Sequence, residues 1–297
     1  MQFILYYISL FFIYLVALIP FPFIYGVSDF LFILIYYIVG YRKKVVIENL
    51  RKSFPEKSEE EIKKITKRFY HYLCDLFIET FKTLTFSENA AKKHCSMHPK
   101  AQALFDRYHA EGKSIILVMG HYGNWEWAGS TFSLLCKQQL YVIYHPLANK
   151  HFNGLICKMR SLFGTKLYAM KDAFKDMMNN KTEISATAFI ADQTPPPESA
   201  YWTKFLNQQT PVFWGTEKIA RKLNYPVVYV SMKLKKRGYY ELHAETLFEN
   251  PKECTVGEIS EAHTRRLEAD IVQQPELWLW SHRRWKHKAP LVEKLRS

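Results

Sequence analysis

The sequence predicts an α/β fold: a mixed, largely parallel sheet flanked by helices, with an N-terminal helical segment that anchors the chain in a membrane. Three observations lead to this prediction. The first forty residues are apolar, with Asp29 as their one charged side chain. From about residue 112 onward, short apolar runs alternate with segments of helical periodicity, which is the order of elements in βαβ folds. Finally, 297 residues, 48% of them hydrophobic, suffice for one large domain or two small ones.

The apolar start of the chain is long enough to cross a bilayer. A spanning helix needs roughly 20 apolar residues, which residues 3–25 provide, whereas residues 30–39 are too few to cross alone. Pro20 and Pro22 separate the two stretches. A cleaved signal peptide would need a positively charged start and a small-residue cleavage site, and the sequence has neither.

Basic residues follow the apolar segment. By the positive-inside bias, Arg42, Lys43 and Lys44 place the rest of the chain on the cytoplasmic side. We therefore expect two parts, a membrane anchor over residues 1–44 and a second domain over residues 45–297.

Charge and cysteine usage agree with this placement. The formal net charge of +13 favours an anionic partner, and the anchor makes an anionic membrane the first choice. We expect no nucleic-acid partner. The five cysteines are odd in number, scattered and without CxxC or metal-ligand spacing, which fits reduced thiols on a cytosolic face.

Helix and strand signals follow one another along the second domain. Ser58 and Glu61 form a capping box ahead of apolar residues at helical spacing, which predicts an amphipathic helix over residues 58–82. A second helix, over about residues 100–110, begins after Pro99. Beyond it we expect strands at residues 114–119, 140–144, 166–169, 184–191, 226–234 and 239–246. The helices between and after them are expected at residues 124–138, 150–163, 172–179, 214–223 and 258–273.

The loop after the first of these strands carries candidate catalytic residues. In open α/β sheets the ligand site lies at the carboxyl ends of the strands. His121 directly follows the strand, and Glu126 comes five positions later. On one helix their side chains would lie about 140° apart, so they pair only if His121 is in the loop and Glu126 in the first helical turn. Gly123 permits the tight turn and Asn124 is a suitable N-cap. We therefore predict His121 as a general base and Glu126 as the carboxylate that orients it.

Three other polar residues are candidates for the site. Asp192 ends a buried apolar strand, on the same sheet edge as His121, with a turn-capping role as the alternative. Arg160 lies near a helix end, where it either compensates the helix dipole or acts as an electrophile toward an oxyanion or phosphate. His145 ends a strand before Pro146, a position that is more often structural. No GxSxG nucleophile elbow occurs, which argues against a covalent enzyme intermediate.

Basic residues alternate with tryptophans near the C-terminus. His282, Arg283 and Arg284 lie between Trp280 and Trp285. This pattern suits phosphate groups and the membrane interface. It also resembles a nucleic-acid patch, against which the anchor argues.

Several of these segments together resemble one family. His121 and Glu126 form an HX4E motif similar to the HX4(D/E) motif of glycerolipid acyltransferases, in particular the bacterial late acyltransferases of lipid A biosynthesis. The other similar blocks are VVIENL (45–50), SFP (53–55), a helix with Glu79, FWGTEK (213–218) and WLWSHRRWK (278–286). The resemblance covers nearly the whole chain in order.

The resemblance implies a glycerolipid-acyltransferase-like fold and a reaction. A fatty-acyl chain would pass from a thioester, either acyl carrier protein or acyl-CoA, to a hydroxyl of a lipid A precursor, without cofactor or metal. His121 would deprotonate that hydroxyl, and by position Arg160 and Asp192 would bind substrate. The expected location is the cytoplasmic face of the inner membrane. Trp125 and Trp127 depart from the family pattern and leave the preferred chain length open.

Other functions stay open at this point. A lysophospholipid or amino-acid-lipid acyltransferase would use the same dyad. A non-catalytic, membrane-anchored lipid-binding protein would explain the charge and the anchor, but not His121 together with Glu126. A metal-dependent hydrolase would use His121, His145 and Asp192 as ligands.

Overall fold

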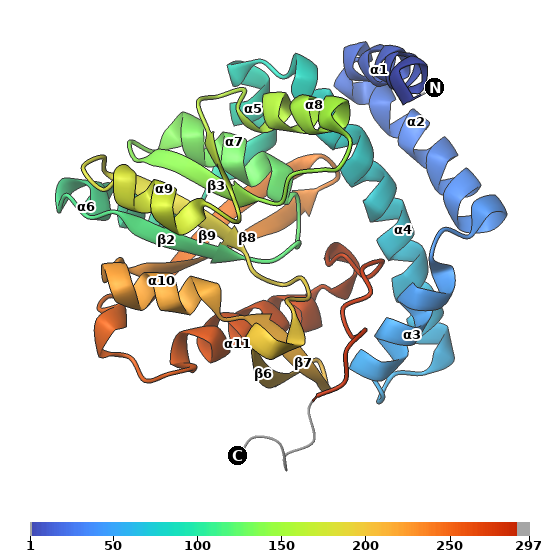
Figure 1. The fold of residues 1–297 in the computed structure, drawn as a ribbon. Coiled ribbons are helices and arrows are strands. Elements are labelled where there is room, and N and C mark those ends of the chain that lie inside the picture. Colours follow the sequence, from blue (N-terminus) through green and yellow to red (C-terminus); the bar gives the residue numbers. More distant parts are fainter. Residues whose placement is uncertain (1, 290–297) are drawn as a thin grey trace.

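A seven-stranded sheet forms the centre of the molecule (Figure 1). The computed structural model describes residues 2–289, so residue 1 and residues 290–297, at the outer ends of the two predicted parts, lie outside the described chain. The strand order is β1-β9-β8-β2-β5-β3-β4. The strands are β1 (Cys95–Met97), β2 (Ile115–Met119), β3 (Gln139–Tyr144), β4 (Lys166–Ala169), β5 (Ser185–Ile190), β8 (Val227–Lys236) and β9 (Tyr239–Phe248).

The sheet is largely parallel, as predicted. Strands β8, β2, β5, β3 and β4 pair in parallel, and β9 returns antiparallel to β8 through a tight turn at Arg237 and Gly238. All five residues of β2 are buried. A strand that is covered on both faces needs such an uninterrupted apolar run, so β2 lies in the middle of the sheet.

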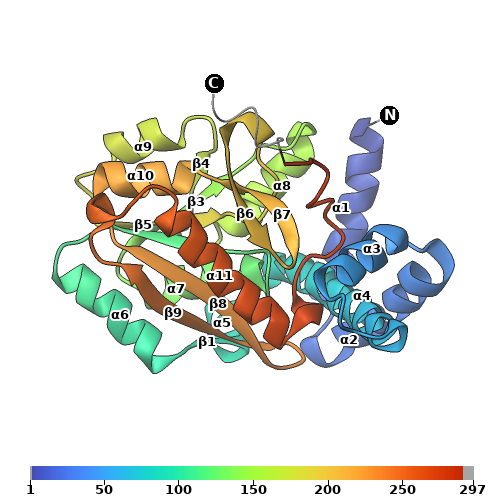
Figure 2. The same cartoon turned by 90° about the horizontal axis from the view of Figure 1, so that it is seen from below.

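Helices cover both faces of the sheet, as Figures 1 and 2 show. One face carries α5 (Glu88–His94), α6 (Pro99–Ala110), α7 (Trp125–Leu135) and α8 (Lys150–Arg160). The other face carries α9 (Ala173–Asn179), α10 (Gly215–Leu223) and α11 (Glu258–Gln273). The predicted α/β class is therefore confirmed, with element ends shifted by a few residues.

A hairpin and a short edge strand were not predicted. Strands β6 (Ala200–Phe205) and β7 (Gln208–Phe213) form a separate antiparallel pair. Their two-residue turn is Leu206 and Asn207, both at positive φ. Asn favours that conformation but leucine does not, so the sequence lacks the usual Asn-Gly signal for such a turn. The edge strand β1 has only three residues, too few for a periodic pattern.

The N-terminal apolar segment is broken at the predicted prolines, but the stretch long enough to span a membrane lies after the break and not before it. Helix α1 (Gln2–Leu18) ends before Pro20, and α2 (Phe21–Ile33) continues into a π-helical turn, Leu34–Val39. Proline is tolerated in the first turn of a helix but not in its interior, so Pro20 stops α1 and Pro22 begins α2. The stretch that is long and apolar enough to cross a membrane is consequently Phe21–Val39, and not residues 3–25.

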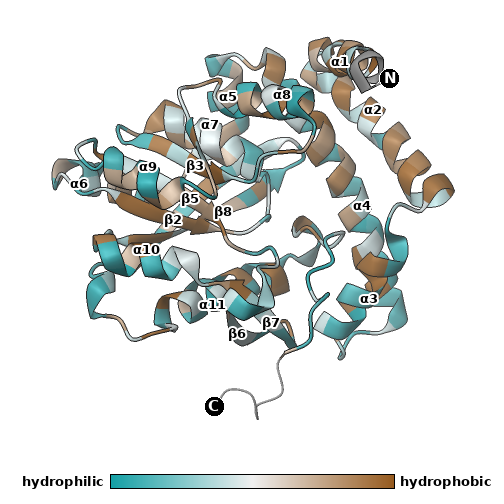
Figure 3. Ribbon diagram, in the orientation of Figure 1, coloured by the Kyte–Doolittle hydropathy of each residue, from teal (hydrophilic) through white to brown (hydrophobic). Residues whose placement is uncertain are grey.

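Helix α2 lies along α4 (Glu59–Lys82), and polar contacts join the two (Figure 1). The Ser28 hydroxyl donates to Asp75 at 2.5 Å. From the β8–β9 turn, Arg237 bridges Asp29 and Asp75 at 2.6 and 2.7 Å. Hydrophobic residues run along the rest of α1 and α2 in Figure 3. Those that are exposed are Tyr7, Ile8, Phe11, Phe12, Leu15, Leu18, Phe23, Phe30, Ile33, Tyr37, Ile38 and Val39.

Candidate active site

His121 lies in the loop between β2 and α7, at the carboxyl edge of the sheet, as the sequence predicted. Gly123 gives this loop its shape: its φ is +61°, and a Cβ there would stand 2.2 Å from the backbone oxygen of Met232. Only glycine fits such an approach. Asn124 then caps α7, because its side chain accepts a hydrogen bond from the backbone N–H of Trp127 at 3.0 Å.

The partner of His121 is Asp192, at the end of β5. Nδ1 of His121 lies 2.6 Å from Oδ1 of Asp192, and the backbone N–H of His121 donates to Oδ2 at 2.7 Å. Because a carboxylate only accepts hydrogen bonds, this contact places the imidazole proton on Nδ1. Nε2 then presents its lone pair on the open side of the site, where the side-chain amide of Gln193 donates to it at 3.3 Å.

Trp278 completes the surroundings of Asp192. Its indole Nε1 donates to Oδ2 at 2.8 Å. Burial by itself would raise the pKa of Asp192, but the His121 ring, the Trp278 donor and the backbone N–H of His121 lower that pKa to about 2. Asp192 is therefore a carboxylate at any physiological pH. It fixes the tautomer of the imidazole and stabilises its protonated form.

Glu126, predicted to orient His121, binds Arg160 in the structure. It lies in the first turn of α7, as expected, but its carboxylate is bound by Arg160 at the end of α8, at 2.6 and 3.0 Å. The described residues form no hydrogen bond between His121 and Glu126, because Asp192 already holds Nδ1. Burial alone would raise the pKa of Glu126. The charge and hydrogen bonds of the Arg160 guanidinium outweigh this effect and lower the pKa below its usual value, so the pair is ionic.

A buried carboxyl group holds the start of α7 in place. Glu79 on α4 is fully buried and accepts hydrogen bonds from Asn124 at 2.8 Å, Tyr240 at 2.8 Å and Tyr25 at 2.9 Å. Its backbone oxygen also accepts from the indole of Trp127. Burial raises the pKa of Glu79 to about 8. The network joins the N-cap of α7 to three other elements and so fixes where Glu126 stands.

Part of the C-terminal segment is interior, which corrects the interpretation of these residues as a surface for phosphates or the membrane interface, whereas Arg283 and Lys286 are exposed. Trp278, Trp280 and Arg284 are each at most 2% exposed. Arg284 lines a small cavity together with Asp192 and His263. Burial lowers the pKa of the Arg284 guanidinium to about 10, and the negative charge of Asp192 opposes that effect. Trp278 and Arg284 of this segment thus lie beside Asp192 in the interior.

An apolar cavity opens beside the ionic pair. It lies between the sheet and α7, and its empty volume, open solvent at the mouth included, is about 580 Å³. Its walls are apolar side chains of β2, β3, β5, β8, β9 and α7. Glu126, Arg160 and Trp125 are its polar rim, and the Trp125 ring meets that of His121 edge to face at 5.0 Å.

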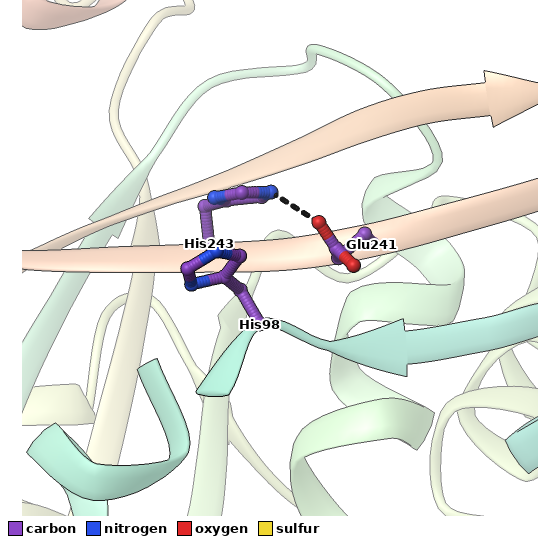
Figure 4. A group of neighbouring side chains, drawn as sticks. All are labelled: His98, Glu241 and His243. Carbon is purple, nitrogen blue, oxygen red and sulfur yellow. Dashed lines mark hydrogen bonds and ion pairs between the residues drawn. The ribbon is translucent and has the colours of Figure 1, made fainter. Parts of the chain in front are cut away.

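A group of potential metal ligands within residues 2–289 lies elsewhere. His98, Glu241 and His243 offer ligand atoms within 4.8 Å of one another at the β1–β9 edge (Figure 4). His98 accepts a hydrogen bond from the backbone N–H of Lys100, and Glu241 binds both His243 and Lys235. His98 therefore caps a helix, and Glu241 and His243 belong to an ion-pair group.

The proposed hydrolase ligands are not brought together. His145 is exposed, and its Nδ1 lies 3.0 Å from the backbone oxygen of Pro146. Within the described chain it forms no ligand group with His121 and Asp192.

The comparison with protein families decides the identity. A model of the bacterial lipid A biosynthesis acyltransferase family matches residues 1–287 of the chain. The chain belongs to this family. The protein is therefore an acyltransferase of lipid A biosynthesis, as the HX4E motif and the segments around it indicated. No curated protein matched the chain.

Sequence reasoning missed two parts of this acyltransferase site. Trp278 lies 86 positions from Asp192 along the chain, and no local pattern marks its indole as a donor. The only available signal was its place in the similar C-terminal block. The hydrogen bond between His121 and Asp192 was missed because the spacing of His121 and Glu126 says nothing about Asp192, which lies beside His121 through the pairing of β2 with β5.

Proposed function

We propose that this acyltransferase moves a fatty-acyl chain from a thioester onto a hydroxyl of a lipid A precursor, with His121 as general base. The observation that carries the proposal is the His121–Asp192 pair, whose imidazole contacts the ring of Trp125, a lining residue of the apolar cavity. The imidazole has its proton on the side of Asp192, and its other nitrogen is directed to the open side. A base in that state, beside a space for an alkyl chain, suits a lipid alcohol and an acyl donor.

The reaction then follows from where each proton and electron pair goes. Nε2 of His121 takes the proton of the acceptor hydroxyl while its oxygen attacks the thioester carbonyl carbon. The resulting oxyanion lies near Arg160, whose guanidinium uses two N–H groups on Glu126 and keeps others for substrate. Collapse of this intermediate breaks the C–S bond, and the leaving thiolate takes the proton back from His121. Asp192 remains ionised throughout.

In this proposal Glu126 positions the arginine. Alone, a cation at the mouth of an apolar cavity would be costly to bury, and a carboxylate that binds it at two points offsets that cost and fixes its plane. The donor is acyl carrier protein or acyl-CoA, both of which present a thioester at the end of a long arm. The acyl chain of the donor occupies the cavity under α7, whose lining is almost entirely apolar.

The N-terminal helices attach the enzyme to the cytoplasmic face of the inner membrane, and they lie in the plane of its interface. If α2 crossed the bilayer upright, the middle of the helix would carry Asp29, and with it Arg237 and Asp75, to the hydrocarbon centre. Charged groups there are expensive. An in-plane position keeps them in the interface while the exposed apolar residues of α1 and α2 enter the lipid.

The depth of α2 tests this position. Fluorophores are attached in turn at Phe23 and Phe30, which are both exposed. Both are expected to be quenched most strongly by lipids whose bromine atoms lie close to the head group. Strongest quenching of the position-30 label by bromines at the bilayer centre would contradict the in-plane arrangement.

Helix α1 also connects the membrane to the site. The Tyr6 ring meets that of Phe152 on α8 edge to face at 5.3 Å, and Ile13 packs with Leu155 and Met159 of the same helix. Helix α8 ends at Arg160, which lines the cavity, and α1 packs against α8. A helix placed in the lipid interface therefore contacts the helix that carries the rim of the cavity. The acceptor lipid therefore has a short path from the membrane to His121.

A transfer assay tests the proposed function. The full chain in detergent micelles is given a labelled acyl-thioester and a lipid A precursor, and acylated product is measured. His121→Ala is expected to lose at least about 10³-fold in rate, and His145→Ala, at an exposed histidine outside the site, serves as the matched control. Full activity of His121→Ala would refute the mechanism. Sensitivity to chelators would favour the hydrolase, lysophospholipid as a better acceptor would favour that acyltransferase class, and no turnover would favour a lipid-binding protein.

A further inference from the structure

A second apolar cavity opens at the same edge of the sheet, on its other face. It lies between α9, α10 and the sheet, with an empty volume of about 670 Å³ including solvent at its mouth. Successive residues of a strand point to opposite faces. Val142 and Ala188 line the cavity under α7, whereas their neighbours Ile143 and Phe189 line the second one. The two cavities are thus separated by the thickness of the sheet.

The two cavities share one lining residue near the end of β5, two positions before Asp192. Ile190, at the end of β5, lines both of them. Ala191, which lines the second cavity, directly precedes Asp192, the residue bound to His121. If each cavity holds one alkyl chain, the groups at the outer ends of the two chains therefore lie near the imidazole of His121.

The FWGTEK segment, which the mechanism leaves without a role, forms one wall of the second cavity. Phe213, Gly215 and Thr216 line it, together with Ile219 one turn further along α10. A Cβ built at Gly215 meets no atom within 4 Å. The absence of a side chain at this position keeps the space open.

The rim of the second cavity is basic. Lys171 lines the cavity; its side chain is 82% exposed, and its ammonium lies 3.8 Å from the carboxylate of Asp172. On the facing helix, Lys218 stands over the Trp214 ring and Lys222 over the Phe174 ring. Apolar walls below exposed ammonium groups suit a molecule with an alkyl chain and an anionic head group.

We infer that the α9–α10 cavity binds one of the fatty-acyl chains that the acceptor lipid already carries. This inference rests on the proposed function. The cavity under α7 takes the chain of the donor, the α9–α10 cavity holds the acceptor by a chain it brings with it, and the lysines at the rim contact its anionic head group. The acceptor hydroxyl then lies between the two cavities, within reach of Nε2 of His121.

Matched glycine substitutions test the inference. Gly215→Leu fills the second cavity, and Ile219→Trp fills it from the next turn should the first variant fold poorly. Gly129→Leu fills the cavity under α7, where a Cβ meets only Leu140 at 3.8 Å. Gly154→Leu is the control, because that glycine is exposed on α8 and its Cβ meets nothing within 4 Å. The probes are a lipid A precursor, a set of precursors each lacking one acyl chain, and acyl-thioesters of graded length.

Gly215→Leu is expected to raise the KM for the complete precursor at least tenfold and to leave the preferred donor length as in the wild type. One of the shortened precursors is expected to show the same KM with the variant as with the wild type, since the chain that the cavity would hold is absent. Gly129→Leu is expected to shift the preference to shorter donors. A Gly215→Leu variant with unchanged KM, or with an altered donor length, would overturn the inference. Absence of transfer by the wild type would instead overturn the proposed function itself, and the inference with it.

Discussion

Replacing Asp192 by asparagine separates the charge of this residue from its shape. Oδ2 of Asp192 accepts from two fixed donors, the backbone N–H of His121 and the indole of Trp278. An asparagine must therefore place its amide oxygen at that position and its NH₂ group toward Nδ1 of His121. The amide then donates to Nδ1, which forces the imidazole proton onto Nε2. The nitrogen that faces the acceptor hydroxyl no longer has a lone pair to act as base.

The magnitude follows from this reversal of the tautomer. The same change in a Ser-His-Asp triad lowers kcat by about 10⁴, which corresponds to about 5 kcal/mol of activation free energy. The fold should change little, because both hydrogen bonds to Oδ2 are kept. Asp192→Asn is thus expected to reduce acyl transfer by about 10⁴ while its thermal unfolding stays near that of the wild type.

The measurement is the rate of acylated product over pH 5 to 9, beside a thermal melt of the same preparation. The low pKa of Asp192 means that its own titration lies outside this range, so the wild-type profile does not report it. An Asp192→Asn rate within tenfold of the wild type would show that Asp192 does not set the tautomer, and the proposed mechanism would have to be abandoned.

Three further substitutions have defined outcomes. Glu79→Gln tests the buried carboxyl group. The pKa of Glu79 is about 8 in the folded chain and near 4.5 in the unfolded chain. Its contribution to the free energy of unfolding is therefore complete below pH 4.5 and falls by on the order of 5 kcal/mol as the pH rises toward 8. The variant should therefore lose less stability than the wild type in melts between pH 5 and 9, and parallel curves would contradict this. Trp278→Phe keeps an aromatic side chain but removes the donor to Asp192 and part of a buried ring, at a cost of about 2 kcal/mol or more in urea unfolding; an unchanged midpoint would mean that neither the hydrogen bond nor the lost packing contributes. Arg160→Lys keeps the charge beside Glu126 but loses the two-point contact, and kcat/KM should fall about 10²-fold with little change in stability; activity equal to the wild type would exclude a role of the guanidinium geometry.

The position of the catalytic loop was predictable because its signals are local. An uninterrupted apolar run must be a buried strand, Gly123 and Asn124 mark a turn and a helix start, and the functional residues of α/β folds lie where such strands end. These features involve neighbours in sequence, and the structure confirms them. The choice of residues 3–25 as the spanning stretch was mistaken, since that apolar run continues across Pro20 without any change in composition, while the structure ends α1 before Pro20.

The partners of the site residues were not predictable in the same way. Whether His121 binds Glu126 or Asp192 depends on the pairing of β2 with β5 and on the approach of α8, and neither leaves a trace in the spacing of the motif. The burial of Trp278 and Arg284 was equally hidden, because a segment of alternating basic and aromatic residues has the same composition at a membrane surface and in an interior.

By itself, the sequence determined the α/β class, the apolar N-terminus, the place of His121 at a strand end and the family to which the chain belongs. All of these rest on patterns within a few residues or on motifs in chain order. Only the tertiary structure decided which carboxylate holds the imidazole, that Glu126 binds Arg160, and that two apolar cavities flank the site. The physical reason is that hydrogen bonds and cavities form between elements far apart in the chain, and the strand order that brings them together is a property of the packed sheet.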